Sequence, residues 1–152
     1  MIYTREGLAQ ALFQVLQEVP GLVTCSRFLK GLQEVPDADQ PALFLTLGGF
    51  TPIQDPSGAP TRWKHEYLVY VLATSKDPLT PPSAVLNNII DAVEAALKPQ
   101  VNGPPGFPGT VQVLGDSTGR IRHCWISGPI YADEGVLGDQ TFAAIPIEIE
   151  IV

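Results

Sequence analysis

The chain has 152 residues, of which 45% are hydrophobic and 16% are charged, a composition that supports a folded core and argues against a disordered chain. This length suits one domain and is short for two. Nine basic residues against sixteen acidic ones give a formal charge of -7, which argues against a protein that grips nucleic acid through clustered Lys and Arg. The same charge suits a protein that lets DNA pass, because acidic side chains repel phosphates.

Two cysteines, Cys25 and Cys124, lie in apolar, strand-like runs. The N-terminal segment has no apolar centre of the secretory type, and no apolar run is long enough to span a bilayer. We therefore expect synthesis in the cytoplasm, no membrane association, and free buried thiols rather than a disulfide.

The first predicted element is an amphipathic helix over residues 5–18, with Thr4 as its N-cap. Its apolar face consists of Leu8, Leu12, Val15, Leu16 and Val19. Phe13 lies at the margin of this face. We expect Phe13 to flank the core, and the alternative is that it anchors a neighbouring subunit.

Three strands are predicted next. Residues 22–28 form a short strand, and after a polar passage a second strand covers 42–50, with the nearly continuous apolar residues of a strand buried on both faces. Gly48 and Gly49 predict a bulge at its far end. The third strand covers 63–74 and runs from solvent into the middle of the sheet.

The loop between the second and third strands, residues 51–61, contains three prolines. We expect an exposed arm that does not pair in the sheet. A loop of about eleven residues is long for a hairpin and is frequently functional, although an ordinary long hairpin loop is the alternative.

The second half of the chain begins with a predicted helix from Thr80 to about Lys98, since Pro81 and Pro82 suit a first helical turn. Its apolar stripe consists of Val85, Leu86, Ile89, Ile90, Val93, Ala96 and Leu97. The Gly and Pro content of 100–110 predicts an irregular loop, followed by a short strand over 111–114 and a turn over 116–119.

The last stretch predicts a long β-hairpin: a strand over about 123–131, an acidic connection over 133–140, and a closing strand in the last twelve residues. In the closing strand, Glu148 and Glu150 are expected to face water. The alternate positions face the core: Ala143, Ile145, Ile147, Ile149 and Ile151. Pro146 lacks an amide donor, which predicts an edge strand or a bulge.

These elements, in the order α β β β α β β β, predict an α+β fold. We expect a mostly antiparallel sheet of about five to six strands with two amphipathic helices packed on one face. Residues 1–152 are expected to form a single domain.

The sequence contains no recognisable catalytic or metal-binding pattern. His123 and Cys124 are adjacent on a strand and point to opposite faces, and no CxxC or HxxxH pair is present. Cys25 has no evident base, so we expect a small buried hydrophobe. We predict no catalytic residue, no metal and no cofactor.

Acidic residues gather at Asp133, Glu134 and Asp139, around Gly135 and Gly138. The ligand spacing of a calcium loop is absent. A solvated turn is one interpretation, and a surface between subunits or facing a pore is the other.

Four short sequence motifs follow one another near the C-terminus: WISG (125–128), DEG (133–135), LGDQ (137–140) and IPI (145–147). Together with QPALFLTLGG and the helix SAVLNNIIDAVEAAL, they resemble the tail terminator (tail completion, minor tail protein U-like) proteins of long-tailed bacteriophages, in particular siphophages of Gram-negative bacteria. The resemblance extends over most of the chain. The segment 100–110, together with extra residues near Asp116, departs from the family pattern and looks like an insertion.

The resemblance implies a structural virion protein, not an enzyme. Such proteins form a hexameric ring in the neck region of the tail, assembled in the host cytoplasm. The ring caps the tail tube, stops its polymerisation and presents a joining surface for the head, while DNA crosses its pore without specific binding. The implied partners are other copies of the chain, the tail-tube protein and a head–tail connector protein.

Within this ring, sites can be assigned as expectations. Tube docking is expected at the loop residues Thr51, Ile53, Gln54, Asp55, Ser57 and Thr61, with the loop 103–109 second. Contacts between subunits or with the pore are expected at Asp133, Glu134, Asp139, Gln140, Glu148 and Glu150. The closing strand, as an edge strand, is expected to pair with the adjacent subunit.

Two other functions compete with this one. Another neck component, a head–tail joining or stopper protein, would share ring symmetry but contact the portal side. A small enzyme or ligand-binding α+β domain would need a pocket with converging polar groups, which the sequence does not indicate.

Overall fold

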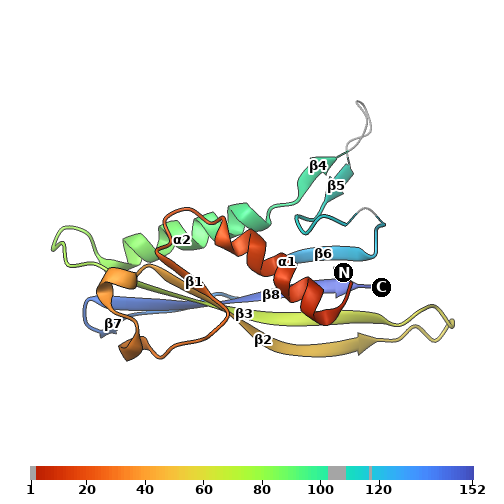
Figure 1. Ribbon diagram of the computed structural model, residues 1–152, viewed down its shortest axis with the longest axis horizontal. Coiled ribbons are helices and arrows are strands. Elements are labelled where there is room, and N and C mark those ends of the chain that lie inside the picture. Colours follow the sequence, from red (N-terminus) through yellow and green to blue (C-terminus); the bar gives the residue numbers. More distant parts are fainter. Residues whose placement is uncertain (1–2, 103–108, 117) are drawn as a thin grey trace.

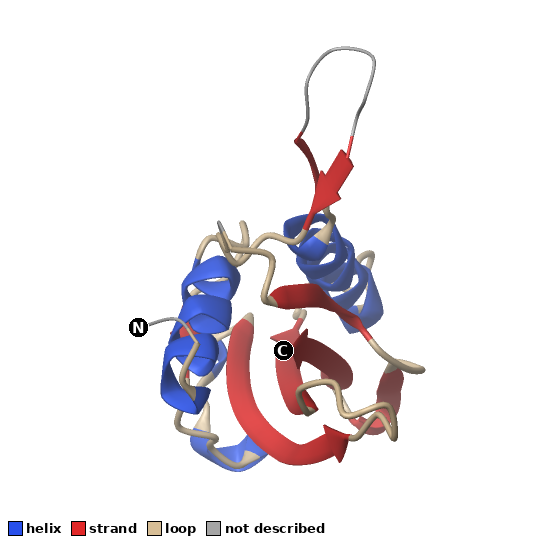
Figure 2. Cartoon of the chain, turned by 90° about the vertical axis from the view of Figure 1, so that its right-hand side faces the viewer, coloured by secondary structure: helices blue, strands red, loops and turns tan. Residues whose placement is uncertain are grey.

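Six strands form one curved, mostly antiparallel sheet in the computed structural model, which describes residues 3–102, 109–116 and 118–152 (Figures 1 and 2). The helices are α1 (Arg5–Gln17), η1 (Leu32–Glu34), η2 (Asp37–Asp39) and α2 (Pro82–Leu97). The strands are β1 (Thr24–Ser26), β2 (Ala42–Ile53), β3 (Arg62–Thr74), β4 (Gln100–Asn102), β5 (Gly109–Val111), β6 (Ile121–Ile126), β7 (Tyr131–Leu137) and β8 (Gln140–Ile151). The sheet order is β1-β2-β3-β8-β6, with β7 also pairing β8, and among the strand pairs that the structure describes only β1–β2 is parallel. The α+β prediction is confirmed.

The centre of the sheet is made by β2, β3 and β8, whose registers place Val69 between Leu45 and Ile145. All three side chains are buried and lie on the face that α1 and α2 cover. Each helix turns its apolar stripe toward this face. The buried residues are Leu8, Ala9, Leu12 and Leu16 of α1 and Leu86, Ile89, Val93 and Leu97 of α2.

The helix ends differ in their agreement with the sequence prediction. Thr4 caps α1 as expected, because its hydroxyl oxygen accepts the N–H of Gly7 at 2.9 Å. The predicted start of α2 at Thr80 is two residues too early, since the helix begins at Pro82. Pro81, not Thr80, occupies the N-cap position without a side-chain cap, since the Thr80 hydroxyl donates to Asp77.

A second, smaller core lies on the opposite face of the sheet, at one end. Phe44 and Leu72 are buried there beneath Val35, which lies between η1 and η2. The polar passage before β2 therefore covers part of the face that the helices leave open. This explains why the first half of β2 is apolar on both faces, as the sequence indicated.

Hydrogen-bond pairing corrects three loop predictions. Residues 51–53 belong to β2 and pair with β3, so the predicted unpaired loop 51–61 is shorter. The predicted irregular stretch 100–110 has ends that pair as β4 and β5, and the strand predicted over 111–114 ends at Val111. The acidic connection 133–140 is mostly β7, which pairs with β8 up to a turn at Gly138. The predicted bulge is confirmed, since the register shifts between Leu47 and Gly49.

Pro146 does not mark an edge strand, because β8 has β3 on one side and both β6 and β7 on the other. Pro146 lies at the position where the partner changes from β7 to β6. Its carbonyl accepts the N–H of Ser127 at 3.0 Å. In an antiparallel ladder the N–H and C=O groups of one residue point toward the same neighbouring strand. The nitrogen of Pro146, which carries no hydrogen, therefore faces the junction between β6 and β7, and the pairing of β8 with β3 is intact. The expected pairing of β8 with a neighbouring subunit is wrong for the same reason.

Candidate functional site

The two glutamates of β8 form the centre of a charged cluster on the face of the sheet that α1 and α2 do not cover. Strand alternation places Glu148 and Glu150 on the face opposite Ile147 and Ile149. On β6, His123 lies across from Glu150 and Trp125 lies across from Glu148.

Five contacts hold these carboxylates. Arg62 donates to Glu150 at 2.6 Å, and Arg122 lies 4.0 Å from the same carboxylate oxygen. Lys64 lies 3.6 Å from Glu148. The two nitrogens of the His123 ring bridge the pair, with Nε2 at 2.8 Å from Glu148 and Nδ1 at 3.8 Å from Glu150.

The expectation that Glu148 and Glu150 face water is wrong. Their side chains are only 12% and 11% exposed, because the long side chains of β3 and β6 close over them. Burying a carboxylate is unfavourable unless it is paired, and here the three fixed cations Arg62, Lys64 and Arg122 surround two carboxylates. This surface is therefore not acidic, although the sequence of β8 alone made it look so.

Trp125 extends this cluster toward solvent. Its ring stacks on His123 with centroids 3.8 Å apart and an interplanar angle of 14°. The residue is nevertheless 51% exposed. A large exposed aromatic side chain held in place by stacking is a suitable contact for another protein.

The remaining predicted acidic residues lie around β7 and the turn into β8. Glu134 and Asp139 are exposed, whereas Asp133 is half-buried opposite Phe142. The Asp139 carbonyl oxygen accepts the N–H of Ser75 at 3.1 Å, so this turn is fixed to the end of β3. Gln140 is half-buried and donates to Asp37 at 3.4 Å. The structure thus brings four predicted residues to one end of the sheet, apart from Glu148 and Glu150.

The predicted docking loop is a hairpin tip. Gln54, Asp55, Ser57 and Thr61 lie in the exposed connection between β2 and β3. Figure 1 shows that this hairpin extends beyond the other strands. Asp55 stabilises the turn by accepting the Ser57 N–H at 2.8 Å, and this hydrogen bond lowers the pKa of Asp55.

Two residues assigned to that loop belong to β2 itself. Thr51 is exposed and pairs with Lys64, while Ile53 is half-buried and pairs with Arg62. The second expected docking loop, residues 103–109, lies outside the described residues except for Gly109, the first residue of β5.

Phe13 and the cysteines are part of the packing. Phe13 is half-buried against the main core, as expected of a core flank. Burial raises the pKa of Cys25 to about 11 and that of Cys124 to about 12, so both thiols are protonated at neutral pH. Within the described ranges no group of three or more His, Cys, Asp or Glu side chains is arranged to hold a metal ion. In the same ranges no helix is long and apolar enough to cross a membrane.

Comparison with solved structures finds a similar fold in a chain from the virion of a native gene transfer agent (GTA) particle. The TM-score is 0.54 at 16% sequence identity, and the match covers 98% of each chain. A second solved chain matches with a TM-score of 0.50 at 17% identity, over 97% of this chain and 92% of that one. No protein-family model and no curated protein matches the sequence. The likeness establishes a shared fold from end to end.

Proposed function

We propose that this chain is a structural protein of a phage-type virion and acts as a tail terminator. One observation carries the proposal: the fold follows a chain of the GTA virion over 98% of both lengths. The order of the four short motifs between residues 125 and 147, which resembles that of tail terminator proteins, supports the same conclusion independently. The whole chain, residues 1–152, then acts as one structural domain in the neck of the tail, without an enzymatic role.

In this function the chain forms a ring that caps the tail tube, stops tube growth and offers a joining surface to a connector protein. The β2–β3 hairpin tip is suited to tube docking, because it is exposed and extends beyond the sheet. Glu134 and Asp139 are suited to a DNA-facing surface, because they are exposed and acidic, whereas Glu148 and Glu150 are neutralised by their neighbours.

Shortening the hairpin tests the docking assignment. Ile53 pairs with Arg62, so residues 54–61 can be replaced by Asn-Gly, which closes a tight hairpin without changing the register. We expect this variant to assemble as the wild type does but to leave tubes of uncontrolled length when mixed with the tail-tube protein from the same genome. Electron microscopy of tube lengths provides the measurement.

The control for this variant is Leu79→Ser, which changes a 90% exposed side chain in the connection between β3 and α2. It should cap tubes normally. Normal tube lengths with the shortened hairpin would contradict the docking assignment. Binding to the portal protein rather than to tubes would identify the chain as another neck component.

Charge reversal tests the DNA-facing assignment. The double variant Glu134→Lys and Asp139→Lys places cations on a surface that phosphates would pass. Rings should remain intact while DNA ejection slows in a salt-dependent way, measured by fluorescent dye binding to released DNA. Unchanged ejection would show that these residues do not line the pore.

A further inference from the structure

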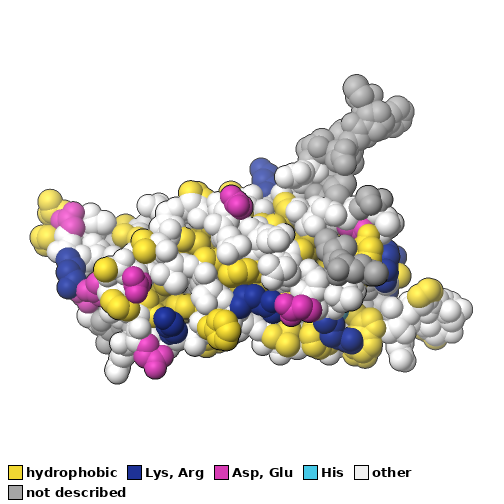
Figure 3. All heavy atoms as spheres, viewed as in Figure 1, with side chains coloured by type: hydrophobic (Ala, Val, Ile, Leu, Met, Phe, Trp, Pro, Cys, Tyr) yellow, Lys and Arg dark blue, Asp and Glu magenta, His cyan; other side chains and the backbone are white. Residues whose placement is uncertain are grey.

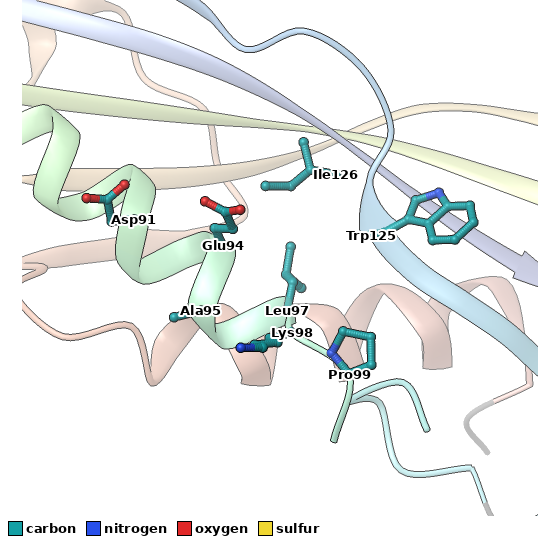
Figure 4. Close-up of a pocket in the computed structure, with 8 residues that line it drawn as sticks. All are labelled: Asp91, Glu94, Ala95, Leu97, Lys98, Pro99, Trp125 and Ile126. Carbon is teal, nitrogen blue, oxygen red and sulfur yellow. The ribbon is translucent and has the colours of Figure 1, made fainter. Parts of the chain in front are cut away.

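A groove of about 560 Å³ lies between the C-terminal half of α2 and strand β6 (Figure 4). Its apolar part includes Leu97, Ile126 and the half-exposed ring of Trp125. Asp91 and Glu94 project from exposed positions of α2 along the same groove. The groove therefore offers an apolar, aromatic surface beside two carboxylates.

The charges of Asp91 and Glu94 are not balanced by ion pairs within the described residues. Among the described residues that line the groove, Lys98 is the one basic side chain. The groove thus has a negative excess. A matching partner would present an apolar anchor next to a positive charge.

The chain itself carries such a segment directly after β1. Phe28 is 81% exposed and Leu29 is 53% exposed, and exposed Lys30 follows them. Lys30 has no ion-pair partner among the described residues. Figure 3 shows hydrophobic and basic side chains exposed close together where the chain leaves β1.

Local contacts hold this segment in place. Arg27 forms an ion pair with Glu6 on α1, and the Ser26 hydroxyl oxygen accepts the N–H of Phe28 at 3.0 Å. A fixed anchor loses less conformational entropy on binding than a free one. Phe28 and Leu29 are adjacent and both exposed, and contiguous exposed apolar surface is typical of interaction sites.

The segment and the groove lie at different edges of the sheet. The segment follows β1, which is the strand at one end of the order β1-β2-β3-β8-β6, and the groove lies beside β6 at the other end. A contact between these two surfaces on different copies is heterologous, so each copy can both give and receive it. Such contacts repeat to form a ring or a filament.

We propose that the segment 27–30 of one copy binds the α2–β6 groove of the next copy. Phe28 packs against Trp125, and Lys30 pairs with Asp91 and Glu94. This contact rests on the proposed function in that it specifies how subunits of the ring join. A second copy is the occupant because the complementary apolar and charged groups are both present in this chain.

Paired charge changes test the contact. One variant carries Lys30→Glu, and the other carries Asp91→Lys with Glu94→Lys. Each variant alone places like charges across the contact, whereas in an equal mixture every contact can join opposite charges if the two variants alternate. Sedimentation velocity should show that the wild type is assembled. Each variant alone should self-associate with a dissociation constant at least about tenfold higher, and the equal mixture should assemble again.

A hydrophobic change and its control complete the test. Phe28→Ser should weaken self-association by at least about tenfold, while Leu79→Ser, at a similarly exposed apolar side chain elsewhere, should not. With Phe28→p-benzoylphenylalanine, photo-crosslinks should join the segment to peptides from α2 or β6 of another copy. Circular dichroism of each variant verifies that it is folded.

The outcomes separate the contact from the function. Wild-type assembly that persists in both charge variants, or crosslinks to other elements, would overturn the contact and leave the tail-terminator function in place. A wild type that forms no ring either alone or on tube ends, yet still stops tube growth, would do the same. Assembly that depends on this contact in a protein that does not cap tubes would support the contact and overturn the function.

Discussion

The buried carboxylate of Glu150 gives a sharp test of the charged cluster. The substitution Glu150→Gln keeps the shape of the side chain and removes its charge. It weakens the 2.6 Å hydrogen bond from Arg62 and the attraction to Arg122. The substitution therefore changes the electrostatics of the cluster with little change in packing.

The size of the effect follows from burial. Exposed ion pairs contribute about 0–1 kcal/mol, whereas hydrogen bonds to charged groups contribute about 1.5–3 kcal/mol. The Glu150 side chain is 11% exposed, while Arg62 is 35% exposed and can regain water when its partner is lost. We expect a loss of about 2 kcal/mol in the free energy of unfolding, or roughly 4–8 °C in Tm for a domain of this size.

Urea denaturation followed by the fluorescence of Trp63 and Trp125 measures this loss. The matched control is Glu134→Gln, which makes the same change at an exposed position of β7 and should alter stability by less than about 0.5 kcal/mol. Equal effects of Glu150→Gln and Glu134→Gln would refute the conclusion that the cluster is buried and structural.

Three further predictions concern local features. The Cys124 thiol is buried and its pKa is raised to about 12, so it should not react with a thiol reagent in the native protein at pH 8. Half-buried Cys25, whose pKa is raised to about 11, should react slowly, and its reaction should become faster as the pH rises. Rapid labelling of Cys124 would contradict its burial. Burial alone would raise the pKa of Asp116, but the hydrogen bonds that its carboxylate accepts lower this pKa below the usual range. The wild type should therefore be more stable than Asp116→Asn at pH 7 and should lose this advantage as the pH falls below about 4. Parallel pH–stability curves of the two proteins would contradict this reasoning. Gly21→Ala should destabilise the protein by about 1 kcal/mol or more in urea denaturation, because φ is 87° and a Cβ would lie 3.2 Å from Ile89, and an unchanged midpoint would refute this.

The elements with one strong period could be predicted from the sequence. The Leu8, Leu12 and Leu16 stripe and the Ile145, Ile147 and Ile149 alternation each identify one buried face, and both faces meet in the main core. Hydrophobic burial along a helix or strand is local in sequence, so the pattern and the structure agree.

The charged cluster could not be predicted, because it depends on register between distant strands. Glu150 meets Arg62 across β3 and His123 across β6. Arg62, Lys64 and Glu66 alternate along the sequence, which indicates a polar face but not which strand lies beside it. Alternation alone therefore suggested exposed glutamates where pairing buries them.

The boundaries near Pro and Gly were predicted least well. Pro146 suggested an edge strand, yet its missing donor faces the change of partner between β6 and β7. Pro52 suggested an unpaired loop, yet it lies opposite Trp63 at the end of the β2–β3 ladder. A proline removes one backbone N–H donor from one side of a strand, and the sequence does not reveal whether a hydrogen-bonded neighbour lies on that side.

The most direct test of the tail-terminator proposal is the oligomeric state of the purified chain, measured by native mass spectrometry with and without the tail-tube protein from the same genome. A hexameric ring, or a monomer that becomes a ring on tube ends, is the predicted result. A chain that stays monomeric and does not bind the tube would contradict the proposed function.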